Sequence, residues 1–147
     1  MLALLQRVAA ARVEVAGDTV GAIERGLLVF VCAEPEDDEA LADRLVARIL
    51  KLRLFADAAG KMNRSVVDVG GGLLIVSQFT LAADLSSGNR PGFSRVASPA
   101  LGHRLYDRVV STARASHHPV QAGVFGADMQ VHLVNDGPVT IPLTLRG

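Results

Sequence analysis

Apolar residues follow two different periods along the chain, and the change between them predicts the order of the elements. Val, Leu and Ala dominate the first third, which predicts strands over residues 3–15, 19–23 and 27–33 with a turn at Gly17-Asp18. The third of these is apolar throughout, as is typical of a strand buried on both faces. Residues 120–125, 129–134 and 139–145 predict three more strands, separated by turns at 126–128 and 135–138.

Helical spacing marks two segments between these groups of strands. Leu41, Leu45, Ile49 and Leu52 follow the acidic run 34–39, whose carboxylates suit the first turn of a helix. Ser98-Pro99 pairs a capping serine with proline at the first helical position, and apolar residues recur from 101 to 112. A further strand is predicted over 73–80, and residues 53–55 predict a short one before a loop over 57–64. This order predicts an α+β fold, with residues 1–147 as one domain.

Composition places the chain among globular proteins, with half of its residues hydrophobic and a fifth charged. Fifteen Lys and Arg balance fifteen Asp and Glu, which argues against binding nucleic acid by bulk charge but not against a local basic patch. The most basic stretch holds five arginines against Asp107 alone, namely Arg90, Arg95, Arg104, Arg108 and Arg114. Either a solvated helix face or a phosphate-facing surface explains this stretch.

The usual signs of metal, disulfide or membrane chemistry are weak. Cys32 is the single cysteine and lies in an apolar strand, so we predict a buried, unreactive thiol and no disulfide. The four histidines show no metal-ligand spacing, and we expect no metal and no cofactor. Gln6 and Arg7 interrupt the apolar N-terminus, and no window approaches the length of a membrane span. We therefore expect a cytoplasmic protein without membrane contact.

Two short segments carry the candidate chemistry, and each has an ordinary structural explanation. Ser77-Gln78-Phe79-Thr80 closes an apolar strand with polar groups, which fits either the lining of a pocket or a strand leaving the core. Asn135-Asp136-Gly137-Pro138 consists of turn-forming residues and fits a hairpin turn. If the Gly137–Pro138 bond is cis, two successive carbonyls can face the same way and accept hydrogen bonds from an ammonium group; the sequence does not set the isomer.

Together these segments resemble the D-aminoacyl-tRNA deacylase family. Ser77-Gln78-Phe79-Thr80 matches its Ser-Gln-Phe-Thr motif, and Gly137-Pro138-Val139-Thr140 matches its Gly-Pro motif. Further similar pieces are 61–63, 88–91 and 125–129, and Arg7 lies at the expected distance from the start. The resemblance runs nearly end to end, and two motifs in order at this spacing are far more specific than either alone.

The resemblance implies a homodimeric hydrolase with a mixed, strongly curved β-sheet, two main helices and a dimer contact across the sheet edge. Its substrates would be D-aminoacyl-tRNA and glycyl-tRNA, recognised at the terminal adenosine. The carbonyls of Gly137 and Pro138, joined by a cis bond, would hold the α-amino group in the partner subunit's site and reject L side chains. Arg7 would pin that loop across the dimer, with Met129 in support. Ser77, Gln78, Phe79 and Thr80 would line the pocket around the ester, and the 2′-hydroxyl of the tRNA would assist catalysis.

Four points stay open at this stage. The loop 84–88 lacks the lysines often found in the family, so tRNA contacts would fall to Arg90, Arg95, Arg104 and Arg108. A non-catalytic dimeric RNA-binding module would use the same arginines and treat the Gly-Pro segment as a plain turn. An esterase with Thr80 or Ser77 as nucleophile is a further alternative, although no base is evident beside either residue. A related branch that edits L-alanyl-tRNA has different motifs and ranks well behind.

Overall fold

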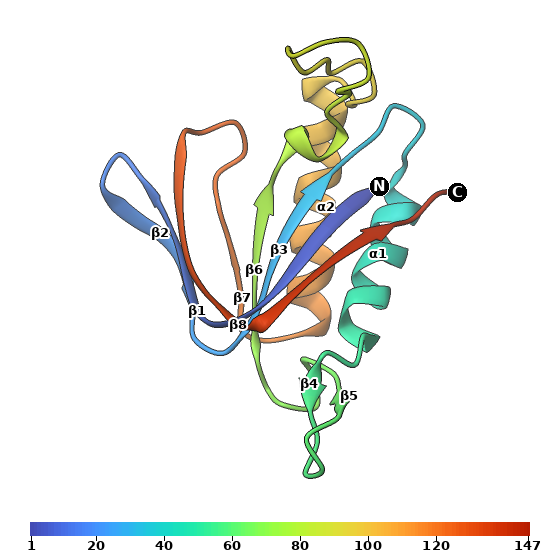
Figure 1. The fold of residues 1–147 in the computed structure, drawn as a ribbon. Coiled ribbons are helices and arrows are strands. Elements are labelled where there is room, and N and C mark those ends of the chain that lie inside the picture. Colours follow the sequence, from blue (N-terminus) through green and yellow to red (C-terminus); the bar gives the residue numbers. More distant parts are fainter.

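The chain folds into a mixed, strongly curved β-sheet with two long helices on one face. The computed structural model describes all residues, 1–147. The strands of the main sheet are β1 (Leu2–Val15), β2 (Asp18–Ile23), β3 (Gly26–Cys32), β6 (Gly72–Ser77), β7 (Val120–Ala122) and β8 (Met129–Thr144). A small second sheet pairs β4 (Phe55–Ala56) with β5 (Met62–Arg64). The α+β class and the curved mixed sheet agree with the expectation (Figure 1).

Long β1 connects the two halves of the main sheet. It pairs antiparallel with β3 through its first half, with β2 through its second half, and with β8 along nearly its whole length. β3, β6 and β7 then add parallel neighbours. The side of β8 away from β1 has no paired strand, so a sixteen-residue strand forms an open sheet edge.

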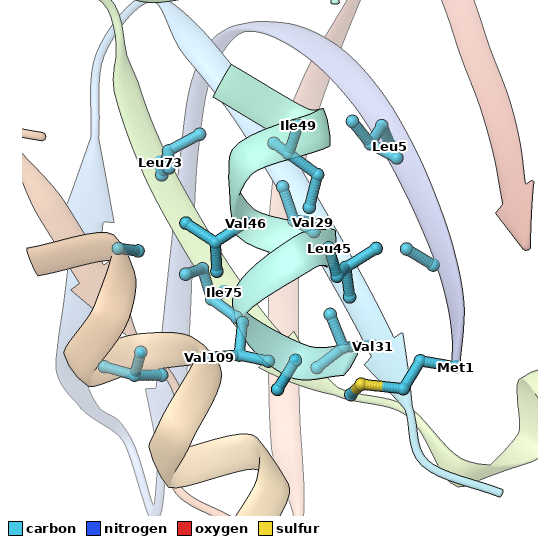
Figure 2. Close-up of a cluster of buried hydrophobic side chains, with 14 of the residues drawn as sticks. Met1, Leu5, Val29, Val31, Leu45, Val46, Ile49, Leu73, Ile75 and Val109 are labelled. Atoms are coloured by element: carbon cyan, nitrogen blue, oxygen red, sulfur yellow. The ribbon is translucent and has the colours of Figure 1, made fainter. Parts of the chain in front are cut away.

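The helices begin where the sequence predicts. Asp38 caps α1 (Glu39–Lys51) and Ser98 caps α2 (Pro99–Ser116), each accepting a hydrogen bond from the backbone N–H three residues on. Both helices pack on one face of the sheet, over a cluster that includes Leu45, Val46, Ile49 and Val109 (Figure 2). A smaller cluster around Val13, Leu28 and Leu74 fills the concave face. No helix is both long enough and apolar enough to span a membrane.

Three of the predicted elements were wrong in detail. β6 ends at Ser77, and Phe79–Ala82 forms a short 3-10 helix, η1, instead of continuing the strand. The segment 57–64, predicted as a loop, contains β5. Residues 135–138 do not form a hairpin turn between two strands, because β8 is one strand and its two halves pair with the same partner, β1.

An ion pair with a hydrogen-bonded threonine joins α1 to α2. Arg108 donates from Nε and Nη2 to the two carboxylate oxygens of Asp43, each at 2.8 Å, and Thr112 Oγ1 donates to Asp43 at 2.8 Å. The hydrogen bonds from Arg108 and then from Thr112 lower the pKa of Asp43 to about 2. The carboxylate therefore stabilises the fold above its unfolded pKa near 4, and this contribution is lost as the pH falls towards 2.

We expect Asp43→Asn to lower Tm at pH 7 by about 2–4 °C, a small effect because the pair is exposed to solvent. The difference from the native protein should shrink between pH 4 and pH 2, as Asp43 takes up a proton. Calorimetric Tm values across this pH range measure it. Asp18→Asn, at an exposed strand end, is the control and should show no such trend. A Tm difference that is constant from pH 7 to pH 2 would contradict the assignment.

Candidate active site

A cavity of about 510 Å³ opens where β3 and β6 end. Ser77, Gln78 and Phe79 line it, as does Met129 at the beginning of β8. Phe79 is half exposed and packs edge-on against Phe93 of the 83–97 loop, with ring centroids 5.0 Å apart. Thr80 lies just outside the lining, and its hydroxyl accepts a hydrogen bond from Gln78 Nε2. The polar motif is thus at a pocket, as one of the two sequence interpretations requires.

Cys32 and Tyr106 are the only ionisable side chains that line the cavity, and both stay neutral at physiological pH. No Asp, Glu, His, Lys or Arg side chain lines it. Burial raises the pKa of Cys32 to about 11, with the nearby Glu34 carboxylate adding to the effect. Burial also raises the pKa of Tyr106 to about 12. The cavity therefore lacks a side chain that can take up a proton as a general base near neutral pH.

These two residues hold the walls of the cavity in place. The Tyr106 hydroxyl donates to the carbonyl of Ile75 at 2.7 Å and lies 3.4 Å from the carbonyl of Gly123. The Cys32 thiol lies 3.6 Å from the Phe79 carbonyl, within reach of a weak S–H hydrogen bond. Sequence analysis missed both as pocket residues, because buried Cys and Tyr carry no motif beyond their apolar surroundings.

The thiol of Cys32 should resist alkylation in the folded protein. With a pKa of about 11, about one thiol in a thousand is ionised at pH 8, against about one in four for a free cysteine. We expect iodoacetamide at pH 8 to leave the folded chain unmodified over an hour, as mass spectrometry would show. The same reagent in denaturant should modify the chain within minutes. Fast labelling of the folded protein with loss of activity would contradict the predicted inert thiol.

The backbone at the beginning of η1 offers two free donors beside the cavity. Gln78 N–H is occupied by the carbonyl of Val31 at 2.8 Å. The N–H groups of Phe79 and Thr80 have no acceptor within the protein, as is usual for the first residues of a helix. Both residues follow directly after the end of β6, within the polar motif.

Gly137 and Pro138 lie at the opposite end of the sheet from this cavity. β1 pairs Gln6 with Thr140 and Val8 with Asn135, so that Arg7 alone faces the four residues 136–139 of β8. Those four residues bulge out of the ladder. The Gly137–Pro138 bond is cis, and both residues are exposed. Across the sheet, Ser77 lies at the same level as Ala3 of β1. Ala3 precedes Arg7 by four residues, which is about 13 Å along the strand.

Polar side chains from β1 and β8 fix the shape of this bulge, which we call the Gly-Pro bulge (residues 136–139). Arg7 donates from Nε to the Asp136 carbonyl at 3.1 Å and from Nη1 to the Leu54 carbonyl at 2.8 Å. Asn135 accepts from Val139 N–H at 3.2 Å and donates to the Thr140 hydroxyl at 2.9 Å. Arg7 therefore anchors the bulge of its own chain. The supporting role of Asn135 and Thr140 was not foreseen, since the pairing across β8 is invisible in the sequence.

The four arginines suggested for tRNA contact have different surroundings. Arg90 is exposed in the 83–97 loop, and Arg95, in the same loop, lies 3.8 Å from Asp84. Arg104 and Arg108 point from α2 towards α1, where Glu39 and Asp43 pair with them. The face of α2 that reads as basic in the sequence is thus largely neutralised by carboxylates of α1.

Comparison with known proteins gives consistent matches. The family model described as D-Tyr-tRNA(Tyr) deacylase matches residues 4–144. Curated proteins named D-aminoacyl-tRNA deacylase are 67% identical in Variovorax paradoxus, over 99% of both chains, and 68% identical in Methylibium petroleiphilum, over 99% of this chain and 95% of the other. A solved structure titled c-Myc DNA Unwinding Element Binding Protein is 39% identical, with a TM-score of 0.94 over all of both chains. A probable eukaryotic D-amino acid tRNA deacylase, 17% identical with a TM-score of 0.85 over 97% of both chains, shares the fold.

Proposed function

The chain belongs to the D-aminoacyl-tRNA deacylase family and is a hydrolase of D-aminoacyl-tRNA, and we propose that its active site is completed by a second copy of the chain. The single observation that carries this proposal is the separation of the two motifs. Ser77 and Gln78 line the cavity at one end of the sheet, while the Gly-Pro bulge projects from the other end. One chain therefore cannot bring both motifs to one ester. Two copies related by a twofold axis can, each placing its bulge in the other's cavity.

In this arrangement the bulge supplies the handedness filter. The carbonyls of Gly137 and Pro138 accept hydrogen bonds from the substrate's α-ammonium group, and their exposure leaves them accessible to a partner chain. Arg7 and Asn135 hold the bulge, so the acceptors are fixed before the substrate binds. With the ammonium group and the ester both held, an L side chain would point into the wall of the bulge and a D side chain would point to solvent. Glycine has no side chain to reject, so glycyl-tRNA is a substrate as well.

The proposed catalysis relies on the substrate's own hydroxyl. The cavity lacks a general base at neutral pH, and the ester is already reactive. The 2′-hydroxyl of the terminal adenosine lies beside the ester and takes part in proton transfer when the water attacks. The protein contributes position, together with the free N–H groups of Phe79 and Thr80, which donate to the oxygen that gains negative charge. Water adds to the carbonyl carbon, the ester C–O bond breaks, and the 3′-oxygen leaves with a proton, giving D-amino acid and free tRNA.

Four further residues take part in this proposal. Gln78 positions Thr80 through their hydrogen bond, and Phe79 covers the mouth of the cavity with Phe93. Met129 packs at its inner wall. Residues 1–147 would form a single deacylase domain.

The decisive test is deacylation of matched D- and L-tyrosyl-tRNA, with glycyl-tRNA as a third substrate. We expect hydrolysis of the D and glycyl esters, and at least about 10³-fold slower hydrolysis of the L ester. Sedimentation at the assay concentration should show two chains per particle. Equal rates on D and L esters would overturn the handedness filter, and a fully active monomer would overturn the shared site.

A further inference from the structure

The positive side chains without a carboxylate partner gather at one end of the molecule. Six of the fifteen Lys and Arg pair with carboxylates within 4 Å, and nine do not. Seven of these nine lie at the end that carries the Gly-Pro bulge: Arg25, Arg48, Lys51, Arg53, Lys61, Arg64 and Arg114. We call this set the basic foot. It lies where α1, α2 and the β4–β5 hairpin end, at the bottom of Figure 1.

Neutral partners hold several of these cations in place without cancelling their charge. Arg53 Nη1 donates to the Asn63 side chain at 2.9 Å, and Arg64 Nη2 donates to the Asp68 carbonyl at 2.7 Å. The Arg25 guanidinium lies 5.4 Å from the centre of the Phe55 ring. Lys51 and Lys61 are exposed and make no ion pair. Residues 48–68 hold five cations against two carboxylates, in a chain whose net charge is zero.

The two carboxylates of this stretch are occupied by the backbone. Asp57 accepts from the N–H groups of Ala59 and Lys61, and Asp68 accepts from the N–H of Ser65. These hydrogen bonds lower the pKa of both carboxyls. Their oxygens face the turns that they close, so the cations are the groups left for an outside partner. The two other arginines of α2 that the sequence singled out, Arg104 and Arg108, pair instead with carboxylates of α1.

Arg7 connects the Gly-Pro bulge to the segment that leads into the β4–β5 part of the basic foot. The guanidinium of Arg7 joins the Leu54 carbonyl, directly before β4, to the Asp136 carbonyl at the base of the bulge. Wherever the bulge is inserted, the basic foot must follow. In the proposed two-chain site, the bulge reaches the partner's cavity, where the 3′ end of the tRNA would be bound. The foot then lies beside the RNA strand that leaves that cavity.

From this placement we infer that the basic foot binds the phosphates of the tRNA acceptor end whose terminal adenosine is bound in the partner subunit's cavity. The inference rests on the proposed function, since it needs a shared site. Each substrate would then be bound by two chains. One chain supplies the cavity, and the other supplies both the Gly-Pro bulge and the cations that bind the phosphates. Lys and Arg on fixed backbone are the usual phosphate ligands, and their contacts weaken with added salt.

The test removes two charges that have no structural partner. We expect Lys51→Ala combined with Lys61→Ala to raise KM for D-tyrosyl-tRNA by roughly tenfold and to leave kcat unchanged. Binding of tRNA without an amino acid can be measured by fluorescence anisotropy at several salt concentrations. In a plot of the logarithm of the association constant against the logarithm of the salt concentration, the slope of the double variant should be shallower by about 1.4 to 1.8. Arg90→Ala with Arg95→Ala removes the same charge from the cavity end and should change KM several-fold less. An equal or larger effect from the Arg90/Arg95 pair would overturn the inference.

A minimal substrate separates failure of this inference from failure of the shared site. D-tyrosyl-adenosine has the ester and the 2′-hydroxyl but no phosphate, so the lysine double variant should hydrolyse it at the native rate. If the native protein fails to distinguish D- from L-tyrosyl-adenosine, the proposed function fails. If it distinguishes them and the lysine variant keeps a native KM for the tRNA substrate, the basic foot has no role in binding.

Mixed dimers show which of the two chains binds the tRNA phosphates. Ala127→Tyr fills the cavity of one chain, which leaves a single working pocket in a dimer with an unblocked chain. We expect KM to rise when the lysine substitutions are on the blocked chain and to stay native when they are on the chain with the open pocket. The reverse pattern would contradict the inference that the basic foot of one chain binds the tRNA held in the cavity of the other chain.

Discussion

Gly137→Ala is expected to reduce kcat/KM for D-aminoacyl-tRNA by at least about a hundredfold while leaving the fold intact, because a displacement of about 1 Å is enough for such a loss. Gly137 has φ +134°, a conformation that residues with a side chain rarely adopt. An added Cβ would lie 2.9 Å from Val139 Cγ2 and 3.1 Å from Arg7 Nη2. Val139 is buried, so relief must come from a shift of the bulge itself or of Arg7.

The control for this substitution is Gly88→Ala. Gly88 also has a positive φ, of +107°, but its Cβ would meet no atom within 4 Å, and it lies in an exposed loop. Both variants thus carry backbone strain, while only Gly137→Ala disturbs the proposed acceptors. Steady-state kinetics on D-tyrosyl-tRNA, with Tm measured for each variant, compare them. Native activity in Gly137→Ala would show that the carbonyl positions do not matter for turnover.

Elements with local signals could be predicted from the sequence. The capping serine and Pro99 mark the beginning of α2, and the acidic run with Asp38 marks that of α1. The apolar run after Gly26 gave β3 correctly as a strand buried on both sides. In each case the signal lies within a short stretch of the sequence, although the contacts that bury β3 come from β1 and β6.

Features decided by distant partners could not be predicted in the same way. The segment 135–138 contains the residues that a hairpin turn requires, and the same residues also suit a bulge. Only the pairing of β8 with β1 before and after this segment distinguishes a bulge from a turn. Likewise, Arg104 and Arg108 read as a free basic face until Glu39 and Asp43 of α1 are placed against them. The polar motif at 77–80 was located, but the residues that shape its cavity, such as Tyr106 and Phe125, have no sequence signature.

Removing the 2′-hydroxyl of the terminal adenosine should damage catalysis far more than removing the hydroxyl of Thr80. A positioned acid or base group typically contributes about 10²–10⁴-fold, and the cavity offers no side chain to replace it. We therefore expect D-tyrosyl-tRNA ending in 2′-deoxyadenosine to be hydrolysed at least about a hundredfold more slowly, with similar binding. Thr80→Ala should lose less than about tenfold, because Thr80 only accepts a hydrogen bond from Gln78.

The two changes together separate substrate-assisted catalysis from a protein nucleophile. An attack by Thr80 or Ser77 requires a base within hydrogen-bond reach, and the ionisable side chains of the cavity, Cys32 and Tyr106, stay protonated at pH 7. Single-turnover rates on both substrates, with native protein, Thr80→Ala and Ser77→Ala, make the comparison, and intact-protein mass spectrometry looks for an acylated chain. Abolished turnover in either variant, or a trapped acyl-enzyme, would favour the nucleophile. A deoxy substrate cleaved at the native rate would remove the 2′-hydroxyl from the mechanism.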